Sequence, residues 1–409
     1  MADMLLDKLL NDKKVKHLLT RSTGDFMLHT PFPVLDYMNG YKMNIFGEDG
    51  LVSHTQNAVG ISAGSFITLI GKSGVAKSTA AIQIAAHIVR PYDNSFVLHW
   101  DLERATTDTR ILNVTNYSID EYKRKYILKK DDLFIEDIMD SVYAICQMKE
   151  ENKKEIMIDY GILNEFGQRI IGYPPTVCII DAIPNIATKD AKQEMEGGTY
   201  ANRVAKAISQ FYKKLTPLIG KYNITIIAIN HINAKIEINP LQKTAPQLLY
   251  LKMDESIPGG NAPLFLSNNI FKFVAIGSEK YNEEDNGFDG FGVNVEILKS
   301  RSNTNGKSFK MVYNKVKGFD PVRGLYEYAK QNDLIEGRNP KRYVIGYPEY
   351  TFSERTLNED IDNNPELAKC LFSTTRPYLE KELSYIDPAN KNSVIDFDSM
   401  NKQLIDYIK

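Results

Sequence analysis

From Phe66 onward, short apolar runs alternate with longer segments in which apolar residues recur every three or four positions. Four runs rich in β-branched residues predict strands that are buried on both faces of a parallel sheet. These runs are 66–70, 96–101, 176–181 and 224–230. The amphipathic segments predict helices over about 78–90, 134–153 and 199–220. The alternation therefore predicts an α/β fold, with a mostly parallel twisted sheet and flanking helices.

The pattern changes toward both ends of the chain. Phe271–Ile276, Val293–Leu298 and Phe309–Tyr313 predict antiparallel strands that extend the sheet, and the chain beyond about residue 322 is polar and helical in pattern. A short amphipathic helix is expected near the N-terminus, over about 4–19. We therefore divide the chain into an N-terminal lead-in (1–60), an α/β core (61–322) and a mainly helical C-terminal region (323–409).

The loop after the first predicted strand has the order of a phosphate-binding P-loop, G-x-x-x-x-G-K-[ST], with Ala76 in place of the second glycine. Such a loop binds phosphate through backbone N–H groups and the positive N-terminus of the next helix, so a methyl group at Ala76 leaves the donors in place. A register at Lys72 is disfavoured because no loop precedes that lysine. The residues expected to contact nucleotide are Gly71, Lys72, Ser73, Gly74, Val75, Ala76, Lys77, Ser78 and Thr79.

In this register the Lys77 ammonium is expected to bridge the β- and γ-phosphates, and the Ser78 hydroxyl to bind Mg²⁺. ATP and Mg²⁺ are therefore the expected cofactors. The alternative is a glycine-containing β–α turn with a surface lysine.

Acidic residues follow two of the predicted strands, at the edge of the sheet where ligands bind in open α/β folds. The strand at 96–101 runs into Asp101 and Glu103, either of which can orient the water that attacks the γ-phosphate. Either can instead cap the next helix. The strand at 176–181 ends in Asp181, after four apolar residues, which is the shape of a Walker B strand with its acid aimed at Mg²⁺.

Polar and basic residues follow the remaining strands. His231 comes directly after the strand at 224–230 and can sense the γ-phosphate, although a histidine at a strand end is also commonly structural. Lys299 and Arg301 lie two positions apart on an extended segment, so both side chains point the same way. They can clamp the γ-phosphate of a nucleotide on an adjacent subunit. The alternative is a pair of surface charges.

Two long polar loops, at 189–200 and 232–261, follow the third and fourth strands. Long loops inside a compact domain are commonly functional, and basic ones suit single-stranded nucleic acid. The alternative is a pair of solvent-exposed insertions. The residues expected to contact single-stranded nucleic acid are Gly197, Gly198, Arg203, Lys235, Lys243, Lys252, Gly259 and Gly260.

Composition narrows the class of protein. The chain has 409 residues, 43% hydrophobic and 25% charged, which is ordinary for a globular protein and leaves room for two or three domains. The net charge of −2 argues against a strongly basic duplex-DNA binder that acts as a monomer. No apolar run is long enough to span a membrane, so no membrane partner is expected. Three scattered cysteines fit free thiols in a reducing cytoplasm.

The ordered series of motifs resembles the RecA family of strand-exchange ATPases, most closely the bacteriophage UvsX-type recombinases. The resemblance covers about residues 30–335, and UvsX-type proteins also lack the second P-loop glycine. It rests on the segments ISAGSFITLIGKSGVAKS, DLE, VCIIDAIPNIATK, IIAINHI, IPGGNAPLF, NVEILKSR and GFDPVRGLYEYA.

The resemblance implies a RecA-like P-loop core and a DNA-dependent ATPase that forms helical filaments on single-stranded DNA. It implies homologous pairing with duplex DNA and strand exchange, in recombination, repair and replication. Glu103 becomes the catalytic carboxylate and His231 the γ-phosphate sensor, while Lys299 and Arg301 act across the filament interface. The N-terminal helix becomes a subunit contact. Single-strand-binding and mediator proteins are implied as partners, and the cytoplasm of a phage-infected bacterium as the location.

The chain departs from the family at Arg110, where relatives often carry a tyrosine that stacks on adenine. A guanidinium plane can also stack on a base. The C-terminus also lacks the acidic tail that many relatives carry. Two alternatives share most of these motifs: a RecA-fold hexameric helicase or DNA-repair ATPase, and a nucleotide-dependent scaffold with little catalysis.

Overall fold

The fold is built around one large sheet. The computed structural model describes residues 26–49, 51–131, 133–189, 198–234, 247–281 and 289–385. Within this part of the chain, nine strands form a mixed sheet in the order β17-β16-β15-β14-β5-β11-β10-β6-β7. The predicted mostly parallel α/β sheet with an antiparallel extension is confirmed, and it is consistent with a RecA-like core.

The strands have the following bounds, in sheet order: β17 (Gly318–Asp320), β16 (Ser308–Asn314), β15 (Gly290–Ser300), β14 (Asn269–Tyr281), β5 (Phe66–Gly71), β11 (Ile224–His231), β10 (Thr176–Asp181), β6 (Phe96–Asp101) and β7 (Tyr126–Lys129). The strands from β14 to β7 pair in parallel. Their carboxyl ends therefore meet at one edge, where His231 is in register with Gly71, and Asp181 with Asp101.

The predicted antiparallel strands correspond to β14, β15 and β16. For β14 the prediction holds for only one of its two neighbours. It pairs antiparallel with β15 but parallel with β5, so it joins the two parts of the sheet. Its apolar pattern does not reveal this double role, because strand direction depends on which neighbours the chain reaches. The short strands β7 and β17 were not predicted.

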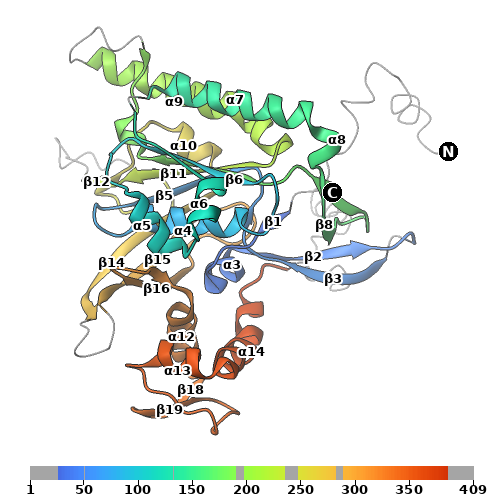
Figure 1. Ribbon diagram of the computed structural model, residues 1–409, viewed down its shortest axis with the longest axis vertical. Coiled ribbons are helices and arrows are strands. Elements are labelled where there is room, and N and C mark those ends of the chain that lie inside the picture. The colour runs from blue at the N-terminus through green and yellow to red at the C-terminus, as the bar shows by residue number, and fades with distance from the viewer. Residues whose placement is uncertain are drawn as a thin grey trace, which may run out of the picture.

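Helices cover both faces of the sheet (Figure 1). Figure 1 shows α7 (Ile135–Glu151) and α9 (Gly198–Lys221) across one face, and α4 (Lys77–Val89), α5 (Asp108–Thr115) and α6 (Ile119–Lys125) on the other. Successive side chains of β10 enter opposite layers. Val177 and Ile179 join the core with α4, whereas Cys178 and Ile180 join the core with α7 and α9. This double burial explains why the strands are continuously apolar.

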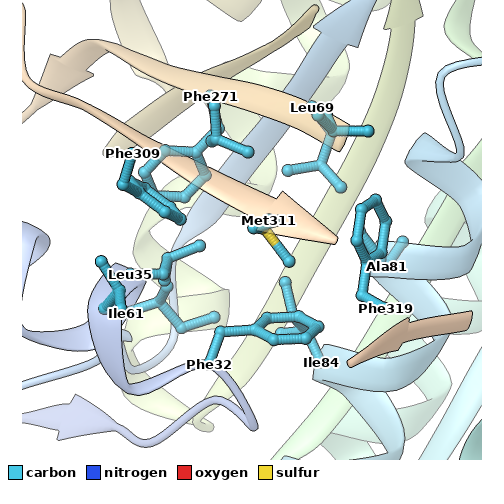
Figure 2. Packing of buried hydrophobic residues seen from close by; sticks show 14 of the residues in the cluster. Phe32, Leu35, Ile61, Leu69, Ala81, Ile84, Phe271, Phe309, Met311 and Phe319 are labelled. Carbon is cyan, nitrogen blue, oxygen red and sulfur yellow. The ribbon is translucent and has the colours of Figure 1, made fainter. Parts of the chain in front are cut away.

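A second group of elements extends the layer that contains α4. Here α3 (Pro33–Asn39) and α12 (Pro321–Gln331) pack against β16 and β17. Figure 2 shows Phe32, Ile84, Phe309, Met311 and Phe319 gathered beside the sheet, with Ile84 on α4. The lead-in and the chain after β17 therefore share one core with the P-loop helix.

Between residues 323 and 385, the described part of the C-terminal region, the chain forms helices and one hairpin. Helices α13 (Leu357–Asn363) and α14 (Pro365–Lys381) follow α12, with the hairpin β18 (Ile335–Arg338) and β19 (Lys341–Val344) before them. The hairpin was not predicted because its strands are short and polar. Helix α12 begins at Pro321, just before the predicted boundary at 322, and the three-part division of the chain stays a prediction.

Two further hairpins lie outside the main sheet in the segments that the structure describes. They are β2 (Tyr41–Phe46) with β3 (Val52–Ala58), and β8 (Ile158–Leu163) with β9 (Arg169–Gly172). The β2–β3 ribbon projects from the body (Figure 1). Most β3 side chains are exposed, so no apolar pattern marked that strand. The predicted helix over 4–19 lies outside the described residues. None of the helices in the described segments combines the length and apolar character that crossing a bilayer requires.

Candidate nucleotide site

The P-loop connects β5 to α4 at the carboxyl edge of the sheet. Gly71 ends β5 with φ 155°, and a Cβ atom there would lie 2.5 Å from the Phe273 carbonyl oxygen of β14. Only glycine therefore permits this close approach of two backbones. Gly74 has φ 81°, and Ala76, which precedes α4, is left-handed at φ 61° and ψ 28°. Ala76 thus adopts a left-handed conformation, which suits the glycine that the P-loop pattern has at this position.

Lys77 is folded back onto the loop. Its ammonium donates to the carbonyl oxygens of Gly71 at 3.0 Å and of Lys72 at 2.8 Å, and the side chain is buried. Burial lowers the pKa of Lys77, and the nearby Asp181 and Glu103 carboxylates act in the opposite direction. Lys72, Ser73 and Gly74 are exposed. The loop therefore presents an open rim around a buried cation.

Asp181 is the buried acid of the site, at the end of the central strand β10. Burial raises its pKa to about 6, with smaller contributions from Glu103 and Asp101, while Ser78 and Lys77 act in the opposite direction. Its Oδ1 atom has no hydrogen-bond partner among the described residues. A buried carboxylate oxygen of this kind is costly unless a cation or donor satisfies it.

Glu103 and His231 form a pair across the ends of β6 and β11. Glu103 Oε1 lies 2.9 Å from His231 Nε2, and both side chains are about one third exposed. The Glu103 backbone N–H donates to the Asp181 carbonyl at 3.2 Å, which fixes the loop against β10. Asp101 instead accepts from the backbone N–H groups of Ala105 and Thr106. The next helix, α5, is capped by Thr107, so neither acid is its N-cap.

The strand end before His231 is tied to the second long loop. The Asn230 amide donates to the Pro258 carbonyl at 2.8 Å, directly before Gly259 and Gly260. The described ends of this loop pair as β12 (Asn233–Ala234) and β13 (Glu255–Ser256). The residue before His231 is therefore joined to this loop by a hydrogen bond.

Arg110 in α5 is bound to three elements at once. One guanidinium nitrogen donates to the Lys315 and Val316 carbonyls at 2.6 and 3.0 Å. The other donates to Thr79 Oγ1 at 3.1 Å and to the Tyr313 hydroxyl at 2.8 Å. Thr79 follows Ser78 in the P-loop helix, so Arg110 is joined by a hydrogen bond to the helix that begins at the P-loop.

Lys299 and Arg301 both reach α10 (Ala262–Leu266), which follows the second loop. The Lys299 ammonium donates to the Leu264 and Phe265 carbonyls at 2.8 and 2.7 Å, and Arg301 donates to Phe265 at 3.1 Å. Burial, and Arg301 beside it, lower the pKa of Lys299 to about 8. The two cations therefore point the same way, and both donate to the Phe265 carbonyl.

The predicted DNA-binding residues are only partly described. Gly198 begins α9, Arg203 is exposed on that helix, and Lys252 is exposed before β13. Gly259 and Gly260 have φ 95° and 75° and lead into α10. Gly197, Lys235 and Lys243 lie outside the described residues.

The residues present fit a magnesium-bound nucleoside triphosphate. The P-loop offers backbone donors at the start of α4, where a helix N-terminus favours anions. Ser78 and the unpartnered Asp181 oxygen supply the hard oxygen ligands that Mg²⁺ prefers.

Sequence reasoning missed two buried side chains behind the site, His99 in β6 and Tyr126 in β7. The His99 Nδ1 atom lies 2.9 Å from the Tyr126 hydroxyl, and its Nε2 atom lies 4.0 Å from Asp181 Oδ2. Burial lowers the pKa of His99 to about 4, so the imidazole is neutral at neutral pH. The available signal was a histidine in the middle of an otherwise apolar buried strand.

Comparison with known proteins adds a second line of evidence. No protein-family model matches the chain. The chain is 26% identical over 219 residues to the protein RecA of Legionella pneumophila (strain Lens), which covers 53% of this chain and 58% of that protein. This similarity supports a relationship between the chain and the RecA family. A further RecA, from Nautilia profundicola, is 25% identical over 212 residues, covering 51% of this chain and 56% of that protein. The chain thus spans little more than half the length of these RecA relatives.

Proposed function

We propose that this protein is a DNA-dependent ATPase of the RecA type, closest to bacteriophage UvsX-type recombinases. In this proposal it forms ATP-bound filaments on single-stranded DNA, pairs them with homologous duplex DNA and exchanges strands. The observation that carries the proposal is the 2.9 Å contact between Glu103 and His231, at the ends of the two strands on either side of Asp181. The similarity to RecA proteins supports the family-level part.

The residues of the chain divide the work along the site. Lys77 leaves the carbonyls of Gly71 and Lys72 and binds the terminal phosphates, since an anion is a stronger partner than two backbone carbonyls. Glu103 orients the attacking water as a general base, and His231 holds Glu103 in place until the γ-phosphate is bound. Ser78 and Asp181 hold Mg²⁺, which, when bound, neutralises charge on the phosphates.

We propose that Arg110 contacts the base of the bound nucleotide. Its guanidinium plane is fixed by internal hydrogen bonds and can stack on a purine through its face. Because its donors are engaged by the protein, it supplies a surface for stacking rather than hydrogen bonds to the base edge.

The proposed DNA contacts are Gly197, Gly198, Arg203, Lys235, Lys243, Lys252, Gly259 and Gly260. The link from Asn230 to Pro258 gives a route from the γ-phosphate to this loop. Lys299 and Arg301 are proposed to act on the nucleotide of the adjacent subunit, and the N-terminal helix to contact that subunit. We also propose single-strand-binding and mediator proteins as partners. The proposed location is the cytoplasm of a phage-infected bacterium.

The test compares ATP hydrolysis by the full chain with and without single-stranded DNA. We expect DNA to stimulate the wild type, and we expect E103Q to lose about 100-fold or more in turnover while it still binds ATP. K77A is the matched control at the phosphate end, and we expect it to lose both turnover and ATP binding. A hydrolysis rate that is indifferent to DNA overturns the proposal.

Electron microscopy of the same sample, with DNA and a non-hydrolysable ATP analogue, separates the remaining alternatives. We expect helical filaments that require nucleotide. Closed rings that unwind duplex DNA support the hexameric helicase instead. If the protein assembles on DNA equally well with and without nucleotide, neither the recombinase nor the helicase is supported, because both need ATP to assemble.

A further inference from the structure

His99 connects the two strands that flank β6. It is fully buried, between Tyr126 of β7 and Asp181 of β10. The ring nitrogens point in opposite directions: Nδ1 lies 2.9 Å from the Tyr126 hydroxyl, and Nε2 lies 4.0 Å from Asp181 Oδ2. A chain of three polar side chains thus runs from the sheet edge to the carboxylate proposed to bind Mg²⁺.

The hydrogen-bonding capacity of these groups fixes the tautomer of the imidazole. Burial raises the pKa of Tyr126 well above its ordinary range, so the phenol keeps its proton. Among the described residues His99 Nδ1 is the partner shown for this buried hydroxyl, so the phenol donates and Nδ1 accepts. A neutral imidazole that accepts at one nitrogen carries its proton on the other. The Nε2–H group therefore faces Asp181.

The opposite tautomer, with the proton on Nδ1, is disfavoured for two reasons. It leaves the Tyr126 proton without an acceptor in a buried position, and it turns the Nε2 lone pair toward a carboxylate oxygen. A buried donor left unsatisfied costs about 1–3 kcal/mol. Both effects favour the arrangement Tyr126 O–H to His99 Nδ1, with Nε2–H toward Asp181.

We infer that His99 is a positioning residue for magnesium binding: its Nε2–H group, 4.0 Å from Asp181 Oδ2 and beyond hydrogen-bond distance, attracts that oxygen electrostatically and leaves Oδ1 directed to the metal. Among the described residues, Asp181 Oδ1 and His99 Nε2 are both buried and without a hydrogen-bond partner. Outer groups that orient a metal ligand commonly change metal affinity by tenfold or more. This inference rests on the proposed function, since it takes Asp181 as a magnesium ligand.

The test measures binding of ADP by calorimetry, once with MgCl₂ and once with EDTA, so that no turnover is needed. We expect H99F to weaken magnesium-dependent ADP binding by about tenfold and to leave metal-free binding unchanged. H99Q places an amide N–H near the position of Nε2, and we expect it to recover most of the loss. H99N keeps only a group near Nδ1, and we expect no recovery.

Y126F provides a second route to the same answer if H99F does not fold. It removes the phenol that fixes the tautomer, and we expect a smaller loss of magnesium-dependent binding. Wild-type magnesium dependence in both H99F and Y126F overturns the inference. An equal loss in H99F and H99Q also overturns it, because packing alone then explains the effect. The proposed function fails separately, if DNA does not stimulate hydrolysis by the wild type.

Discussion

The His231 imidazole lies 2.9 Å from the Glu103 carboxylate, although 128 residues separate them in the chain. Parallel pairing brings the ends of β6, β10 and β11 to one edge, and this edge places the two side chains together. In the proposed mechanism this contact makes Glu103 and His231 act together.

We therefore expect the effects of E103Q and H231A on turnover to be strongly non-additive. E103Q alone removes the general base, so H231A in that background costs little more, with a coupling free energy of about 1–3 kcal/mol. The measurement is kcat at saturating ATP and single-stranded DNA for both single variants and the double variant. H54A, at an exposed position of β3, is the matched control and keeps wild-type kcat. If the losses of kcat in the two single variants add up in the double variant, Glu103 and His231 do not act together.

Ala76 carries backbone strain that a glycine relieves. An L-residue in the left-handed region costs roughly 1–2 kcal/mol, and the extra entropy of an unfolded glycine offsets about 0.4–1 kcal/mol of this. We expect A76G to raise the free energy of unfolding by up to about 1 kcal/mol, measured by urea denaturation without nucleotide. A80G, in the interior of α4, is the control and lowers it by about 1 kcal/mol. Equal destabilisation by both variants contradicts the strain at Ala76.

Arg110 joins α5 to α4 and to the turn between β16 and β17. Removing the guanidinium leaves the Lys315 and Val316 carbonyls without this donor, so we expect R110A to lower the free energy of unfolding by about 1 kcal/mol. R110K cannot reproduce the planar fork and recovers less than half of the loss. Urea denaturation measures both, with the exposed R124A as control. Full recovery by R110K shows that charge alone is sufficient.

Lys149 in α7 gives a testable dependence of stability on pH. Its buried ammonium donates to the Pro174 and Tyr222 carbonyls at 2.7 and 2.8 Å, and burial lowers its pKa to about 7. Above this pH the unfolded chain still binds the proton and the folded chain does not. Stability therefore rises with pH, by up to about 1.4 kcal/mol per unit between pH 7 and 10, and is level below pH 7.

The variant K149Q removes the titrating group. Urea denaturation at pH 7, 8 and 9 then shows a difference from the wild type that widens as pH rises. K154Q changes an exposed lysine close by and keeps the wild-type slope. A constant difference between wild type and K149Q across this range contradicts the lowered pKa.

Local pattern predicted much of the fold. The four central strands and the helices α4, α7 and α9 begin and end within a few residues of their predicted limits, because burial on both faces leaves long apolar runs. The hairpins β2–β3, β8–β9 and β18–β19 were missed, because exposed ribbons carry no such signal. The parallel pairing of β14 with β5 was missed because an apolar strand does not record its direction.

The sequence by itself determined the order of the strands along the chain, the P-loop and the acids and histidine that follow the later strands. These are local features, fixed by side-chain type and spacing. Only the tertiary structure decided that Glu103 pairs with His231 while Asp101 caps its own loop, that Arg110 is held by internal acceptors, and that His99 lies behind Asp181. These relationships depend on which strand ends become neighbours, and strand order in the sheet is a property of packing rather than of any local pattern.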